Sequence, residues 1–202
     1  MFTVIFMART VGSTKSETHG RIVRAAAKAL RREGYAGTRV ADVMKAAGLT
    51  HGGFYAHFPS REAMLAEALD QAGSEAVESL LGAAVVKATA TGTSTLEALV
   101  EGYLSDVHVA ATETGCTLAA LGSETRRQGP EIRRVATRRL KELVRMLGAQ
   151  AATHPGAAEP MAALSAMVGA LLISRVVDEP ALAKQVRASA TRLVLGKPPR
   201  KP

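Results

Sequence analysis

The sequence predicts an all-α protein of about nine helices, because apolar residues recur at helical intervals along most of the chain. Aromatic residues make up only 3% of the 202 residues, and Ala, Leu, Val and Met dominate, a composition that favours helices over sheets. Breaks that contain Gly or Pro separate the helical segments. A chain of this length buries a real core, and we expect it to form one or two domains.

The first predicted helix begins at a capping box and ends at a glycine. Thr14 and Glu17 have the spacing in which each side chain accepts a hydrogen bond from the other residue's backbone N–H. Gly34 supplies the stop signal. The residues that this helix should bury recur at helical intervals: Ile22, Ala25, Ala26, Ala29 and Leu30.

Two short helices separated by a turn follow. The first starts at Thr38, its predicted N-cap. Its apolar stripe consists of Val40, Val43 and Ala47. A Gly-Leu turn at 48–49 breaks the chain, and a second short helix occupies 50–58, where Pro59 ends it because proline disfavours helical geometry at the preceding residue. This arrangement is the helix-turn-helix plan.

The second short helix has the properties of a recognition helix, which exposes small or polar side chains and turns its other face into its own domain. Phe54 and Phe58 lie four positions apart and share the buried face. The remaining face is polar or small: Thr50, His51, Gly53, Tyr55 and His57. Gly52 and Gly53 would cost about 1 kcal/mol each relative to Ala in an isolated helix, and close approach to DNA is one reason to accept them.

Longer amphipathic helices follow Ser60, which is a predicted N-cap. We expect them near 60–86, 95–111, 115–128, 130–152, 158–177 and 180–195. The chain then divides into a disordered basic arm over 1–15, a helix-turn-helix domain over 16–61, a helical domain over 62–196 and a tail over 197–202.

The net charge of +8 is concentrated near the N-terminus. Residues 1–61 carry ten Lys or Arg against three acidic residues, whereas residues 62–202 carry sixteen against fifteen. Such a field suits a polyanion such as DNA, because neutralising phosphates releases condensed counterions. The alternative is a basic face that only aids solubility. The Arg-rich run over 126–139 indicates a solvated helix face rather than a second DNA site, since acidic residues interleave with it.

Several protein classes find no support in the sequence. Cys116 is the single cysteine, so no internal disulfide can form, and we expect a cytoplasmic protein. The longest uncharged apolar stretch, 160–174, is shorter than the roughly 20 residues of a membrane span. Residues 1–6 are apolar but too short for a signal-peptide core, and Met7 is an alternative start. The five histidines show no metal-ligand spacing, and nothing indicates a cofactor.

Residues 38–65, with the sequence TRVADVMKAAGLTHGGFYAHFPSREAML, resemble the DNA-binding signature of the TetR/AcrR family of transcriptional regulators. The resemblance covers roughly 16–69. It implies contacts to backbone phosphates from Thr38, Tyr55 and His57 and base-facing positions for Thr50, His51 and Gly53. Arg39 would contact either. Arg61 could pair with phosphate, although the family often has lysine there and a second aromatic where Ala56 stands.

The same residues also have simpler interpretations. His51 and His57 are alternatively solvated surface residues, and Tyr55 alternatively only packs against its neighbours.

The resemblance also implies that the C-terminal helices bind an effector and that the last two form a dimer interface. The apolar stretches 161–177 and 181–195 suit that interface, although such stripes are also typical of ordinary core. Small residues in the first stretch would allow close approach: Ala162, Ala163, Ala166, Gly169 and Ala170. The stripe in the second stretch is Leu182, Val186, Ser189, Ala190 and Leu193. The candidate pocket residues, which alternatively belong to ordinary core, are Tyr103, His108, Cys116, Met146, Leu147 and Met167.

Cys116 has two interpretations. Residues 115–124 resemble the start of the sixth helix in a subset of the TetR family, some of whose members sense electrophiles or oxidants through that cysteine. A helix N-terminus makes a thiol more reactive. The simpler alternative is a small buried cysteine.

With the resemblance, the sequence predicts a repressor that binds a palindromic operator in double-stranded DNA as a homodimer and is released by an unidentified small molecule. An enzyme is the main alternative. Cys116 and His108 imitate a Cys–His pair, but no third orienting group is evident, so no catalytic residue is assigned. A nonspecific DNA binder would not need residues 62–196, which carry thirteen basic against fifteen acidic residues.

Overall fold

The computed structural model describes residues 14–198, which form nine α-helices, one 3₁₀-helix and no strand. The all-α prediction is therefore confirmed. Most of the predicted basic arm and the end of the predicted tail, residues 1–13 and 199–202, lie outside the described residues. Within the described part, no helix combines enough length with enough apolar character to span a bilayer.

The N-terminal helix-turn-helix unit consists of α1 (Lys15–Gly37), α2 (Val40–Ala46) and the 3₁₀-helix η1 (His51–Ala56). The predicted capping box is confirmed, with 3.2 Å from the backbone N of Glu17 to Thr14 Oγ1 and 2.7 Å from the backbone N of Thr14 to Glu17 Oε2. Gly34 interrupts the helix with a φ of +70°, but the chain then turns once more before α1 ends. A Cβ added at Gly34 would lie 2.7 Å from Glu124 Oε1, so a larger residue would collide with α6.

The rest of the chain forms seven α-helices: α3 (Arg61–Thr91), α4 (Thr95–Tyr103), α5 (Asp106–Ala110), α6 (Thr117–Thr125), α7 (Pro130–Ala151), α8 (Pro160–Val176) and α9 (Pro180–Val194). The prediction of one helix over 95–111 is wrong, because Ser105 starts a new helix by accepting a hydrogen bond from the backbone N–H of His108 at 3.2 Å. α3 also continues past residue 86 and ends at Gly92, a left-handed C-cap.

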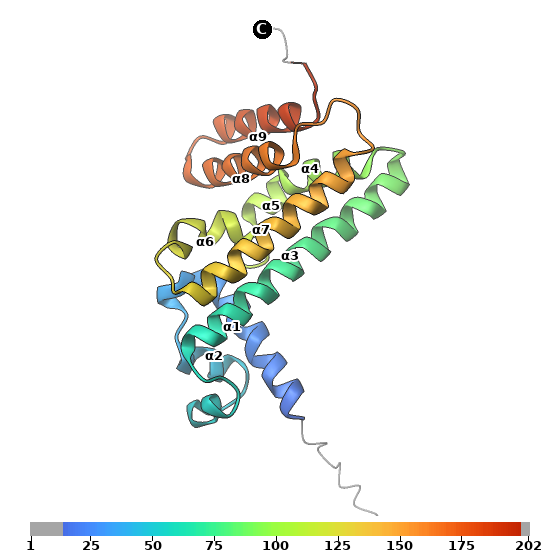
Figure 1. Ribbon diagram of the computed structural model, residues 1–202. Coiled ribbons are helices and arrows are strands. Elements are labelled where there is room, and N and C mark those ends of the chain that lie inside the picture. The colour runs from blue at the N-terminus through green and yellow to red at the C-terminus, as the bar shows by residue number, and fades with distance from the viewer. Residues whose placement is uncertain (1–13, 199–202) are drawn as a thin grey trace, which may run out of the picture.

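Figure 1 shows α3 and α7 side by side along the length of the molecule, with the helix-turn-helix unit at one end and α8 and α9 at the other. One apolar core surrounds the helix-turn-helix unit and includes Leu121 of α6 and Ile132 of α7. A second core lies among the C-terminal helices. Because the first core takes residues from α6 and α7, the helix-turn-helix unit packs directly against the helices of the other half.

Candidate functional site

The segment around η1 divides its aromatic side chains between core and solvent. Phe54 and Phe58 are fully buried, and their rings stack with centroids 5.6 Å apart. Tyr55, next to Phe54, is 75% exposed. The predicted burial of Phe54 and Phe58 is therefore confirmed, although the segment is a 3₁₀-helix rather than an α-helix. Anchoring by the two buried rings presents the opposite side of η1 to solvent.

Most of the predicted DNA-binding residues, in η1 and beside it, are exposed or half-buried. The exposed members are Arg39, Thr50, His51, Gly52 and Tyr55, and the half-buried members are Gly53 and His57. A Cβ added at Gly52 would meet no atom of the described residues within 4 Å. Packing within the chain therefore does not require glycine at position 52.

Two of the predicted DNA-binding residues, Thr38 and Arg61, use their side chains for hydrogen bonds within the chain. Thr38 is fully buried, and its hydroxyl donates to the carbonyl of Gly34 at 2.7 Å. The prediction of Thr38 as the N-cap of α2 is wrong, because the extra turn of α1 places Thr38 at the end of α1, where free carbonyls need donors. Its hydroxyl is not accessible to a phosphate here. The Arg61 guanidinium donates to the carbonyls of Tyr35 and Thr38 and thereby holds the connection between α1 and α2.

A basic groove of about 550 Å³ lies between α1 and α2. Its charged lining residues are Arg21, Arg24, Lys28, Arg32 and Arg39 against Glu33 and Asp42. Lys28 pairs with Glu113 at 3.0 Å, and Arg32 pairs with Glu33. Arg21, Arg24 and Arg39 form no ion pair within residues 14–198. The positive charge that the sequence places in this half is thus partly free for an external polyanion.

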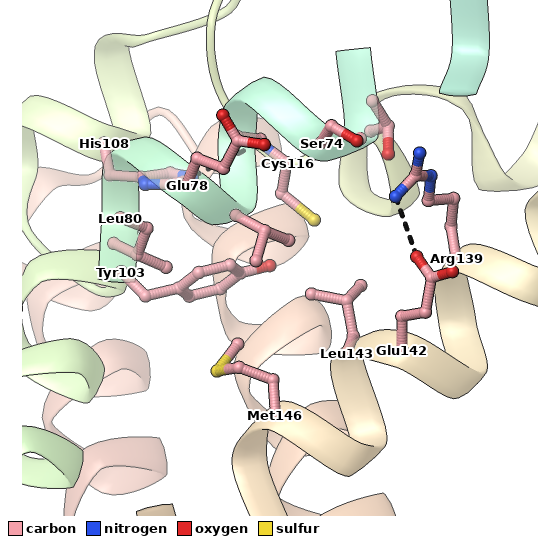
Figure 2. Close-up of a pocket in the computed structure, with 14 residues that line it drawn as sticks. Ser74, Glu78, Leu80, Tyr103, His108, Cys116, Arg139, Glu142, Leu143 and Met146 are labelled. Atoms are coloured by element: carbon pink, nitrogen blue, oxygen red, sulfur yellow. Dashed lines mark hydrogen bonds and ion pairs between the residues drawn. The ribbon is translucent and has the colours of Figure 1, made fainter. Parts of the chain in front are cut away.

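A cavity of about 150 Å³ lies in the other half, where α3 and α7 face α4, α5 and the start of α6 (Figure 2). Four of the predicted ligand-binding residues line it, namely Tyr103, His108, Cys116 and Met146. Leu147 and Met167 do not line it and are instead buried in the second core, as the alternative of ordinary core packing describes.

The Tyr103 hydroxyl points into this cavity (Figure 2), although the residue is only 5% exposed. It has no hydrogen-bond partner within residues 14–198. Burial raises the pKa of the phenol well above its ordinary value, and Cys116 raises it further, so the group keeps its proton at neutral pH. An unpaired buried polar group costs about 1–3 kcal/mol, so a ligand atom that paired with this hydroxyl would bind favourably.

His108 lies against Tyr103 and the start of α6. Its Nε2 accepts a hydrogen bond from the backbone N–H of Cys116 at 3.3 Å, and its ring centroid lies 4.7 Å from that of Tyr103. Burial lowers the pKa of His108, and the positive charge of Arg175 lowers it further. Because Nε2 is bonded to the backbone of Cys116, the geometry does not form a nucleophilic Cys–His pair. Among the described residues, no group of three or more His, Cys, Asp or Glu is arranged to hold a metal ion.

Apart from Met146, the cavity wall that α3 and α7 supply was not predicted from the sequence. The main residues of this wall are Gly73, Ser74, Val77, Leu80, Arg139, Glu142 and Leu143. Arg139 donates to Asp70 at 2.5 Å and to Glu142 at 2.7 Å, so its charge is paired inside the chain. The available signal is the cluster of small residues at 73, 74 and 76, which leaves space between two packed helices.

Arg31 connects the helix-turn-helix unit to α3, which supplies one wall of this cavity, and to the loop that precedes α6. Its side chain is 5% exposed and extends from α1 to α3, where it donates to the carbonyl of Ala72 at 3.0 Å and pairs with Glu75 at 3.1 Å. It also donates to the carbonyl of Glu113 in the loop that precedes α6. A buried arginine thus joins three segments, one of which belongs to the helix-turn-helix unit.

The comparisons with known proteins agree with this fold. A TetR-family transcriptional regulator from Cytophaga hutchinsonii superposes with a TM-score of 0.70 at 23% identity, over 94% of this chain and 99% of that one. Residues 22–68 match the family model of bacterial regulatory proteins of the tetR family. A stretch of 57 residues is 44% identical to the HTH-type transcriptional regulator CymR of Pseudomonas putida. Residues 22–68 are a TetR-family DNA-binding domain.

The match to CymR covers 28% of this chain and 28% of CymR, so it is confined to part of each chain. The structural likeness extends over nearly the whole length. AibR, in a complex with isovaleryl coenzyme A and operator DNA, superposes with a TM-score of 0.55 at 16% identity, over 90% of this chain and 100% of that one. The matched domain is that of bacterial regulatory proteins, and the fold of the whole chain is similar to solved structures of such regulators.

Proposed function

We propose that this protein is a dimeric TetR-family repressor that binds a palindromic operator through η1 and α2 and is released by a small-molecule effector. The observation that carries the proposal is the division around η1, where buried Phe54 and Phe58 hold Tyr55 outward. A short, anchored element with a polar outer face is what docking into the major groove requires. The half-sites of such an operator would lie roughly 34–36 Å apart.

The contacts to DNA divide into two classes, since phosphate contacts position a protein and base contacts specify the sequence. Tyr55, His57 and Arg39 would contact phosphates. Thr50, His51 and Gly53 would face base edges, with Gly52 permitting close backbone approach. The structure of AibR, which has a similar fold, contains isovaleryl coenzyme A and operator DNA, and this supports DNA as a partner of this chain.

The dimer would form through α8 and α9. Large apolar side chains remain exposed there, including Val176 at 76% and Leu193 at 61%. A shallow groove of about 340 Å³ between the two helices contains small residues that permit close approach: Ser165, Ala166, Gly169, Ala170 and Ser189. A two-fold axis through this face gives a four-helix contact. Sedimentation velocity should show a dimer, and Leu193→Asp should shift it toward the monomer.

An effector in the cavity would act on DNA binding through α3 and Arg31. α3 starts at Arg61 beside the helix-turn-helix unit and also forms one wall of the cavity. A shift of its segment 60–84 would change the separation of the two η1 elements in the dimer. The effector must bind better to the separation that does not fit the operator, because only differential affinity shifts such an equilibrium.

The proposal is tested by fluorescence anisotropy with DNA from upstream of the protein's own gene and unrelated DNA as competitor. We expect tight binding that resists the competitor, weakens with salt and falls at least about tenfold in Tyr55→Ala. Val86→Ala, which shortens an exposed side chain near the far end of α3, is the control and should bind like the wild type. Binding that does not depend on sequence would contradict the proposal.

A second candidate function is thiol-based sensing, because Cys116 lines the cavity beside Tyr103. Cys116 is only 7% exposed, so an electrophile would have to enter the cavity before it reacts. This function predicts that iodoacetamide labels the native protein and that Cys116→Ser removes any effect of oxidants on DNA binding. A native cysteine that resists labelling, or a Ser variant that keeps the response, contradicts it.

A further inference from the structure

The Tyr103 hydroxyl is a buried polar group in the mainly apolar surroundings of the cavity, where the Cys116 thiol lies beside it. Figure 2 shows the Tyr103 hydroxyl pointing between Cys116 and Leu143, with Leu80 and Met146 also beside the ring. Tyr103 is more than nine-tenths buried, and its oxygen lacks a hydrogen-bond partner within residues 14–198. Buried hydroxyl groups in folded proteins almost always have a partner. The hydroxyl therefore marks the point where a bound molecule would place a polar atom.

The charged groups around the cavity are paired or lie toward solvent. Arg139 is bonded to both Asp70 and Glu142, which leaves no free cation on the lining. Glu78 is exposed. A ligand anion would thus meet carboxylates without a compensating cation. A ligand cation would lose its water for a site whose inner carboxylate, Glu142, is already bonded to Arg139.

The volume limits the size of the ligand. A cavity of 150 Å³ is comparable with one that holds a benzene-sized molecule, which corresponds to about six to ten non-hydrogen atoms. A mainly apolar molecule is favoured because Val77, Leu80, Leu143 and Met146 form much of the wall.

We propose that this cavity binds a small uncharged molecule, mostly apolar, with one hydrogen-bond acceptor such as a carbonyl oxygen, to which the Tyr103 hydroxyl donates. Only the role of this molecule as effector rests on the proposed function. The binding chemistry follows from the cavity itself. A donor is needed from the protein because a carbonyl oxygen can only accept, and Tyr103 is the unpaired buried hydroxyl that the lining offers.

The experiment is isothermal titration calorimetry of the full-length protein with four probes of similar size. Acetophenone has the carbonyl, ethylbenzene lacks it, benzoate is an anion and benzylamine is a cation. The wild type should bind acetophenone about tenfold more tightly than ethylbenzene, because a tenfold difference corresponds to one well-formed buried hydrogen bond. It should bind both charged probes more weakly than acetophenone. Tyr103→Phe should remove the preference for acetophenone. Tyr35→Phe is the matched control and should keep it, because the Tyr35 hydroxyl bonds Thr125 outside the cavity.

Three results would overturn the proposal: equal affinity of the wild type for acetophenone and ethylbenzene, tighter binding of either charged probe, or no binding of any probe at about 1 mM. If circular dichroism shows that Tyr103→Phe does not fold, the affinities of the four probes for the wild type still test the proposal. Anisotropy on the same sample separates the two proposals. A protein that binds its operator but not the probes refutes only the ligand class, whereas binding of probes without DNA binding refutes the repressor.

Discussion

The two candidate sites are assembled in opposite ways. The proposed DNA-facing surface comes from one continuous stretch, 38–61, and short-range spacing decides which of its side chains are buried. The cavity takes its lining from α3, α4, α5, the start of α6 and α7, over residues 73–146. A continuous site follows from local pattern, whereas an assembled site depends on how long helices pack. Arg31 lies between the two sites, because it extends from α1 to the part of α3 that adjoins the cavity lining.

The largest expected effect tests whether packing and DNA binding are separate in the first site. Phe54→Ala should lower the free energy of unfolding by about 3–5 kcal/mol, because it empties a fully buried position. Tyr55→Ala should change it by less than about 0.5 kcal/mol, since the side chain is exposed, while weakening DNA binding. Urea unfolding measures both variants. Similar losses of stability would show that Tyr55 is a packing residue.

The link between the sites should be the next most sensitive feature. Arg31→Ala leaves the carbonyls of Ala72 and Glu113 without this donor, and we expect the free energy of unfolding to fall by about 1–3 kcal/mol. Arg32→Ala is the matched control. Its guanidinium lies at the surface with Glu33, so thermal unfolding should change far less. Equal effects of the two substitutions would mean that Arg31 holds no special position between the halves.

Local signals predicted the fold well where they acted within one helix. The capping box at Thr14 and Glu17 and the burial of Phe54 and Phe58 follow from spacing alone, and all are present. Thr38 was misplaced because the turn of α1 beyond Gly34 moves the cap of α2 to Arg39. Whether a glycine ends a helix or only bends it depends on the contacts that follow, and these are not local.

The cavity was predicted in part, for a related reason. Tyr103, His108, Cys116 and Met146 were found as chemically distinctive residues. The α3 wall begins with the small residues at 73, 74 and 76, and their role depends on the facing helix. Arg31 could have been found. It continues the buried series of Val23 and Ala27 at intervals of four residues, and a charge on a buried stripe indicates a buried partner.

The salt dependence of DNA binding should distinguish the two halves, with a smaller effect than the changes in stability above. Arg39 is exposed in the basic groove and has no ion pair within residues 14–198, and Arg145 is exposed on α7 in the other half. Arg39→Ala should reduce the slope of log K for DNA against log salt concentration by about one, because one phosphate contact is lost. Arg145→Ala should leave the slope unchanged. Anisotropy at several salt concentrations measures both, and equal changes would place DNA contacts beyond the helix-turn-helix unit.

The smallest expected effect is a pH dependence that originates in the cavity. Burial and the charge of Arg175 place the pKa of folded His108 below its ordinary value of 6.5. As the pH falls below 6.5, the unfolded chain takes up this proton before the folded chain does, so the free energy of unfolding decreases until the folded pKa is reached. Above 6.5 the group contributes no pH dependence.

His108→Gln removes this titration while keeping a side-chain oxygen that can accept from the backbone N–H of Cys116. Melting temperatures measured between about pH 7 and pH 5 should therefore fall more in the wild type than in the variant. His19→Gln is the matched control in the other half, where the ring pairs with Glu67 at the surface. If His19→Gln removes the pH dependence and His108→Gln does not, the titrating group belongs to the helix-turn-helix half, and the folded cavity tolerates a protonated His108.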